Sequence, residues 1–123
     1  RVSKRSESFG DVKVTFQVDM KNVNVSGTGV WISGGSISLA SPGGIQMQPS
    51  NSPDLWEAEL TLPPNSNFTF KYRNGYFPNS WSEGWEVVSG NCTVGQYSDR
   101  SVSIGVADTT LPSVCFNMCA ECI

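Results

Sequence analysis

Histidine is absent from this 123-residue sequence. Its absence removes the imidazole base that activates serine and cysteine nucleophiles, and it removes a common nitrogen ligand of catalytic zinc. Pairs of carboxylates can still hydrolyse glycosides, and the acids available for that chemistry are Asp54, Glu57, Glu59, Glu83 and Glu86. The simplest interpretation of these acids is a solvated surface position. We therefore expect a protein that is not an enzyme and uses no metal or other cofactor.

Concentrated positive charge and long apolar runs are also missing. The chain has 8 Lys and Arg against 11 Asp and Glu, a net charge of −3. Apart from Arg1, Lys4 and Arg5 the cations are scattered, so we do not expect a nucleic-acid partner. The apolar runs are too short to cross a bilayer, so we do not expect membrane insertion.

Cysteine is scarce but clustered: the four residues are Cys92, Cys115, Cys119 and Cys122. An even number in the last third of a small chain predicts disulfide bonds in an exported protein. The alternative is a zinc site, suggested by the two residues between Cys119 and Cys122, but a zinc ribbon normally has two such pairs. Of the possible pairings, we favour Cys92–Cys115 with Cys119–Cys122. No signal peptide precedes Arg1, which suggests a processed, mature form.

Alternation of apolar and polar residues predicts strands along most of the chain. The clearest run is residues 12–20, where Val, Phe and Met alternate with polar residues. Residues 56–62 and 68–73 alternate on either side of a Pro-Pro-Asn-Ser turn and predict a hairpin. Shorter strands are predicted at residues 29–33, 45–47, 85–88 and 101–106. Without a helical period in any segment, this pattern predicts an all-β antiparallel sandwich.

Three segments together resemble a known family: residues 14–20 (VTFQVDM), residues 68–75 (FTFKYRNG) and residues 110–122 (TLPSVCFNMCAEC). They resemble the immunoglobulin-like early-set modules of secreted bacterial proteins, especially from Bacteroidetes. Those modules are related in fold to the starch- and glycogen-binding domains of amylolytic enzymes. The resemblance covers residues 11–122 and implies a single immunoglobulin-like β-sandwich.

The sequence departs from the glucan-binding relatives at one point. After the second strand these relatives usually have a Gly-Ser-Phe-Asn-x-Trp segment, whose tryptophan stacks on sugar rings. Here residues 33–39 read SGGSISL and contain no aromatic residue. The resemblance therefore implies the fold more strongly than the glucan site.

Aromatic residues outside the main alternation are candidates for contact with a carbohydrate or a protein partner. They are Trp31, Tyr76, Phe77, Trp81 and Trp85. Sugar rings present apolar faces that stack on such side chains, and exposed aromatics are also common anchors in protein interfaces. The alternative is that they close an open end of the sandwich, which we favour for Trp85.

Short acceptor motifs suggest glycosylation. Asn24, Asn67 and Asn91 each begin an Asn-x-Ser/Thr tripeptide. Thr109 follows Asp108 in an Asp-Thr-x sequence that resembles the O-glycosylation acceptor of Bacteroidetes. Which of these motifs is used depends on the host.

The sequence divides into an arm at residues 1–10, a sandwich at residues 11–108 and a cysteine-rich segment at residues 109–123. The arm is polar, and only Val2 and Phe9 could anchor it. Addition of the arm to a sheet edge of the next subunit would build a filament. We therefore expect a secreted structural subunit that self-associates. The alternative is a carbohydrate-binding accessory module with a polysaccharide as its partner.

Overall fold

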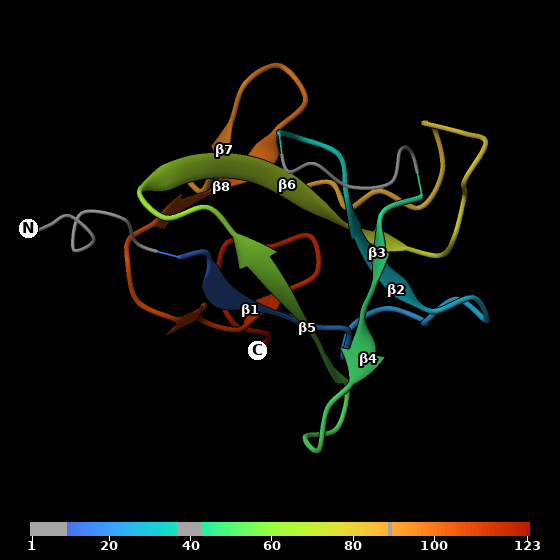
Figure 1. The fold of residues 1–123 in the computed structure, drawn as a ribbon. Coiled ribbons are helices and arrows are strands. Elements are labelled where there is room, and N and C mark those ends of the chain that lie inside the picture. The colour runs from blue at the N-terminus through green and yellow to red at the C-terminus, as the bar shows by residue number, and fades with distance from the viewer. Residues whose placement is uncertain (1–9, 37–42, 89) are drawn as a thin grey trace, which may run out of the picture.

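Two β-sheets pack face to face in this computed structural model, which describes residues 10–36, 43–88 and 90–123 (Figure 1). No helix occurs within those ranges. Their strands are β1 (Val12–Asp19), β2 (Val30–Ser33), β3 (Ile45–Gln46), β4 (Gln48–Pro49), β5 (Leu55–Leu62), β6 (Ser66–Asn74), β7 (Thr93–Val94), β8 (Asp99–Ile104), β9 (Thr109–Thr110) and β10 (Val114–Cys115). The prediction of an all-β sandwich is confirmed.

The first sheet, sheet A, is built around β1. Its strand order is β10-β1-β5-β4, and β9 also pairs with β1. The β1–β5 ladder is antiparallel and runs from Val12 opposite Leu62 to Asp19 opposite Leu55. In contrast to the fully antiparallel arrangement expected, β9 and β10 pair parallel to β1.

The second sheet, sheet B, has the order β3-β2-β6-β8-β7 and is antiparallel throughout. Its centre is β6, which pairs with β2 through Ser33↔Lys71 and with β8 through Phe70↔Arg100. The predicted hairpin corresponds to β5 and β6, which lie in different sheets, so the Pro63–Pro64 turn crosses the sandwich.

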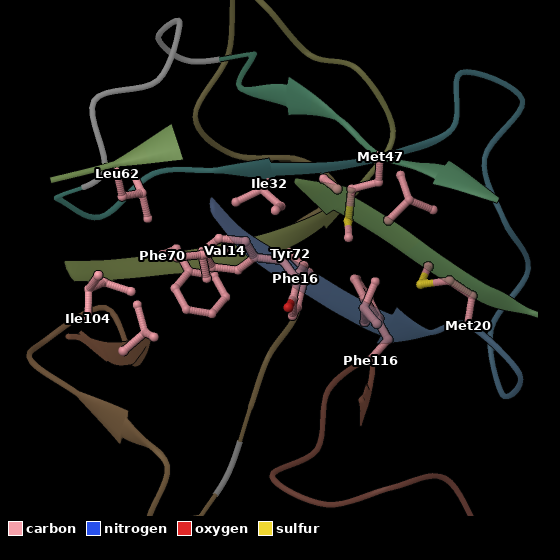
Figure 2. Close-up of a cluster of buried hydrophobic side chains, with 14 of the residues drawn as sticks. Val14, Phe16, Met20, Ile32, Met47, Leu62, Phe70, Tyr72, Ile104 and Phe116 are labelled. Atoms are coloured by element: carbon pink, nitrogen blue, oxygen red, sulfur yellow. The ribbon is translucent and has the colours of Figure 1, made fainter. Parts of the chain in front are cut away.

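The core lies between the two sheets (Figure 2). Because side chains alternate along a strand, β1 points Val14, Phe16 and Val18 inward, and all three are fully buried. The Phe16 ring meets the Phe70 ring edge to face, with centroids 4.9 Å apart. The alternation in the sequence therefore identified the buried face of β1.

Two predicted strands differ from those observed. The strand predicted at residues 45–47 is present as β3 at Ile45–Gln46 but ends before Met47, which is buried between the sheets where the chain passes from sheet B to β4 in sheet A. Residues 85–88 form no strand, and their pairing is reduced to a single bridge between Arg73 and Trp85. The Glu86 side chain, which is buried and paired with Arg100 as described below, sets the path of the backbone there.

The C-terminal segment belongs to sheet A and is not a cap outside the strands. Thr109 and Thr110 pair with Val14 and Thr15, and further along the same edge Val114 pairs with Val18. The segment thus covers the edge of β1 that β5 leaves open.

The four cysteines form two disulfide bonds, Cys92–Cys119 and Cys115–Cys122. The predicted pairing was therefore wrong, and the thiolate zinc site is excluded. The reason lies in the turn after β10, where the Met118 amide donates to the Cys115 carbonyl and the Cys115 amide donates to the Ala120 carbonyl. This compact turn brings Cys122 back to Cys115 and leaves Cys119 to meet Cys92.

Two disulfides indicate folding in an oxidising environment. In the described part of the chain, no helix has the length and apolar character needed to cross a membrane.

Candidate functional site

A groove of about 640 Å³ opens on the outer face of sheet B. Its volume lies within the range of small-molecule and cofactor sites. Residues of both β6 and β8 line it, together with the turn after β2 and the loop that follows β6. The lining residues are Gly34, Gly35, Ser36, Thr69, Lys71, Trp81, Trp85, Tyr97 and Asp99.

The polar residues of the groove come from the outward side of two neighbouring strands. Phe70 and Tyr72 of β6 point into the core, so Thr69 and Lys71 between them point outward. Asp99 lies at the start of β8, beside Lys71. Burial raises the pKa of the Asp99 carboxyl, and the nearby positive charge of Lys71 partly opposes that rise. Opposite charges therefore face the same groove.

Two tryptophans form one wall of the groove, which we call the tryptophan wall (Trp81 and Trp85). Their rings are nearly parallel, with an angle of 4° and centroids 6.2 Å apart. The Trp85 indole Nε1 donates to the Trp81 carbonyl at 2.9 Å. Trp81 remains 58% exposed. A Cβ on Gly34 would lie only 3.2 Å from the Trp85 ring, so the glycine lets the indole rest against the turn after β2.

Arg73 supports the tryptophan wall from beneath. Although it is on the outer face of sheet B, its side chain is fully buried, because the loop at residues 75–88 covers it. The guanidinium lies 4.1 Å from the Trp85 ring centroid and 5.1 Å from that of Phe77. It also donates to the carbonyls of Glu83 at 2.7 Å and Ser80 at 3.0 Å. Burial lowers the pKa of Arg73, and the negative charge of Glu83 opposes this effect.

Of the five aromatic residues singled out in the sequence, Trp81 and Trp85 line the groove. Trp31 and Tyr76 do not line it and stack on each other, with centroids 4.4 Å apart and an interplanar angle of 24°. Phe77 packs against Arg73 inside the loop. Trp31 belongs to β2, whereas Tyr76 and Phe77 belong to the loop after β6, and none of the three lines the groove.

Sequence reasoning missed Tyr97, Lys71 and Asp99. Tyr97 is 69% exposed in the turn between β7 and β8. The signal available for it was an aromatic residue in a Gly-Gln-Tyr-Ser turn. Lys71 and Asp99 gave no such signal, because charged residues on the outward side of a strand are expected for solvation alone.

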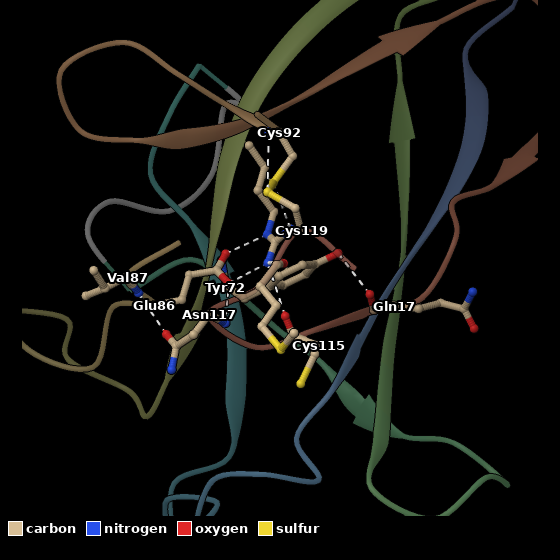
Figure 3. Close-up of polar contacts among 10 residues, drawn as sticks. Gln17, Tyr72, Glu86, Val87, Cys92, Cys115, Asn117 and Cys119 are labelled. Atoms are coloured by element: carbon tan, nitrogen blue, oxygen red, sulfur yellow. Dashed lines mark hydrogen bonds and ion pairs between the residues drawn. A yellow bond between two sulfur atoms is a disulfide. The ribbon is translucent and has the colours of Figure 1, made fainter. Parts of the chain in front are cut away.

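The surface position expected for Glu86 is wrong. Its side chain is fully buried and forms an ion pair with Arg100, with the Arg100 Nε 2.7 Å from Oε2 (Figure 3). The Glu83 carboxylate is exposed and accepts a hydrogen bond from the Ser80 hydroxyl. The two acids beside the tryptophans therefore do not face one substrate together.

The remaining candidates lie apart from the groove or outside the described residues. The modification candidates Asn24, Asn67, Asn91 and Thr109 are all exposed. Val2 and Phe9, the anchors of the predicted assembly arm, lie outside the described residues.

Comparison with known proteins finds no protein-family model that matches this sequence and no match among curated proteins. Function is therefore inferred from the groove itself.

Proposed function

We propose that this protein is a non-catalytic carbohydrate-binding module of a secreted protein, and that it binds a polysaccharide in the groove on sheet B. The observation that carries the proposal is that one groove combines the tryptophan wall, the exposed ring of Tyr97 and the charged side chains of Lys71 and Asp99.

The chemistry of the groove suits sugars. The apolar C–H faces of a pyranose ring stack on aromatic rings, which supply a large apolar surface without losing many rotamers on binding. The hydroxyl groups at the ring edge need donors and acceptors. The ammonium group of Lys71 can donate to them and the carboxylate of Asp99 can accept from them.

The early-set modules that the sequence resembles are related in fold to glucan-binding domains, which agrees with a polysaccharide as the ligand. The turn directly after β2 carries no aromatic residue of its own, but the ring of Trp85, from the loop after β6, lies against Gly34 there. A different loop thus brings an aromatic ring beside the segment in which the glucan-binding relatives usually have their tryptophan.

The positions of the Glu86 and Asp99 carboxylates favour binding without catalysis. Glu86 is held by Arg100 and by backbone amides, so it is not available as a proton donor or nucleophile. Glycoside hydrolysis needs two carboxyl groups flanking one bond, and Asp99 is the single carboxylate among the residues described as lining the groove. Secretion is supported by the two disulfides.

The filament role stays a prediction, since it depends on the arm at residues 1–9. Deletion of these residues tests it: the shortened chain should stay folded and lose self-association. A shortened chain that assembles like the intact one would contradict that role.

Affinity electrophoresis tests the proposed function. The wild-type chain should be retarded in gels that contain soluble starch, glycogen or a mixed-linkage β-glucan. Trp81→Ala should remove the retardation with little change in Tm, because Trp81 is 58% exposed. Tyr76→Ala is the matched control, since this aromatic side chain is 45% exposed but lies outside the groove lining. The proposal is wrong if no polysaccharide retards the wild type, or if both variants lose retardation equally.

A further inference from the structure

We infer that Arg73 is the positioning residue of the groove: it sets the tryptophan wall in its binding geometry before a ligand arrives. This inference rests on the proposed function for its effect on affinity, but its effect on the two indoles can be measured without any ligand.

The first step is the placement of the charge. A guanidinium on the outer face of a sheet normally extends into water, yet Arg73 has no exposed surface. Burial of a charged side chain is unfavourable unless hydrogen bonds and aromatic faces replace its water. The loop at residues 75–88 provides both the carbonyl acceptors and the aromatic rings, so it can cover the Arg73 side chain and exclude water from it.

The second step is that the Arg73 guanidinium contacts the Trp85 ring and the backbone on either side of Trp81. Among its partners are the carbonyls of Ser80 and Glu83, which lie on either side of Trp81 in the chain. Its face lies 4.1 Å from the centroid of Trp85. One side chain therefore fixes the backbone that carries Trp81 and the ring of Trp85 at the same time. Lysine could keep the charge but lacks the planar fork that reaches two acceptors.

The third step is that the loop has other attachments, which should survive the loss of Arg73. The Asn74 amide donates to the Gly84 carbonyl at 2.7 Å, and the Glu86 amide donates to the Tyr72 carbonyl at 3.2 Å. Both bonds join backbone groups and do not involve the guanidinium. A substitution at Arg73 is therefore expected to release the two indoles while the C-terminal end of the loop stays attached to β6.

The consequence for binding is preorganisation. A ligand that must order two tryptophans as it binds loses affinity, whereas a wall already in place avoids that cost. We expect Arg73→Lys to weaken polysaccharide binding by roughly twofold to tenfold, the size of the loss of one aromatic contact.

Hydrogen exchange of the indole N–H groups, followed by NMR, tests the inference in the ligand-free protein. The Trp85 Nε1–H donates to the Trp81 carbonyl at 2.9 Å, and the Trp31 Nε1–H donates to the Thr28 carbonyl at the same distance. In Arg73→Lys and Arg73→Gln, the Trp85 signal should exchange at least about tenfold faster than in the wild type while the Trp31 signal keeps its rate. The Trp31 indole is thus an internal control for general loosening of the fold.

The inference is overturned if the Trp85 indole exchanges at the wild-type rate in a folded Arg73→Lys variant, or if the Trp85 and Trp31 signals accelerate together. If Arg73→Gln does not fold, the lysine variant decides alone. If the wild type binds no polysaccharide but the Trp85 indole is released as expected, the proposed function fails and the positioning role of Arg73 stands.

Discussion

Arg100 and Glu86 form a buried, two-pronged ion pair, in which the guanidinium Nε and Nη2 lie 2.7 and 2.8 Å from the two carboxylate oxygens. The carboxylate also accepts from the amides of Tyr72 at 3.0 Å and Asn117 at 3.2 Å. The guanidinium donates further to the Met118 carbonyl at 2.8 Å. The pair therefore joins sheet B, the loop that carries the tryptophan wall and the C-terminal segment.

Loss of one partner should be strongly destabilising, because it leaves the other charge buried without compensation. We expect Glu86→Gln to lower the free energy of unfolding by about 3–5 kcal/mol, measured by urea denaturation. Glu83→Gln is the matched control, since this exposed carboxylate lies three residues earlier in the same loop. Equal stability of the two variants would show that the ion pair does not hold the fold.

The two disulfides should contribute unequally. Cys92–Cys119 spans 27 residues of sequence separation and Cys115–Cys122 spans 7. In the chain-entropy description the longer loop gives the larger stabilisation, by about 1 kcal/mol here. Paired alanine variants, Cys92→Ala/Cys119→Ala against Cys115→Ala/Cys122→Ala, compare them in denaturant. A larger loss of stability from the second pair would mean that packing around the buried Cys115 outweighs loop closure.

The alternation in the sequence predicted β1, β5, β6 and β8, because each of these strands has one buried face. It missed β4, β7, β9 and β10, which are two residues long, since so short a segment has no period to detect. It also failed at residues 85–88, where Glu86 is buried by an ion pair whose partner, Arg100, is distant in sequence. Spacing alone could not determine the disulfide pairing, which depends on the turn after β10.

The candidate site was only partly predictable for a related reason. Trp81 and Trp85 stand out in the sequence as aromatic residues in a polar loop. Lys71 and Asp99 become part of a groove only because the loop after β6 folds back over the outer face of sheet B. Arg73 was not recognised either, because an outward position on a strand predicts a solvated side chain, and the buried state depends on that same loop.

The free energy of unfolding should depend on pH through the Asp99 carboxyl. Since its carboxyl pKa is raised in the folded protein, the folded state binds more protons than the unfolded state in the acidic range, and the stability from this group is lost as the pH rises through the raised pKa. The Asp99→Asn variant has no such titration. Its free energy of unfolding relative to wild type should therefore increase as the pH rises from the acidic range to neutrality. A difference that stays constant with pH would contradict the burial of this carboxyl.

The turn after β2 should tolerate no side chain at Gly35. Its φ is +64°, and a Cβ there would lie 2.1 Å from the Thr69 carbonyl oxygen. Gly35→Ala should lower stability by more than the roughly 1–2 kcal/mol that a left-handed conformation alone imposes. Gly105→Ala is the control, because a Cβ at that position meets nothing within 4 Å. Thermal unfolding of both variants checks this, and a Gly35→Ala variant as stable as Gly105→Ala would disprove the close approach.

The central claim, that the groove on sheet B binds a polysaccharide, is tested most directly by NMR titrations with oligosaccharides of starch and of mixed-linkage β-glucan. The chain has 4 tryptophans and so gives a small set of indole N–H signals, which substitution of single tryptophans assigns. We predict that the Trp81 and Trp85 signals shift and saturate with one of these ligands, while those of Trp31 and Trp56 stay in place. Unchanged Trp81 and Trp85 signals at the highest ligand concentration, or shifts confined to Trp31 and Trp56, would contradict it.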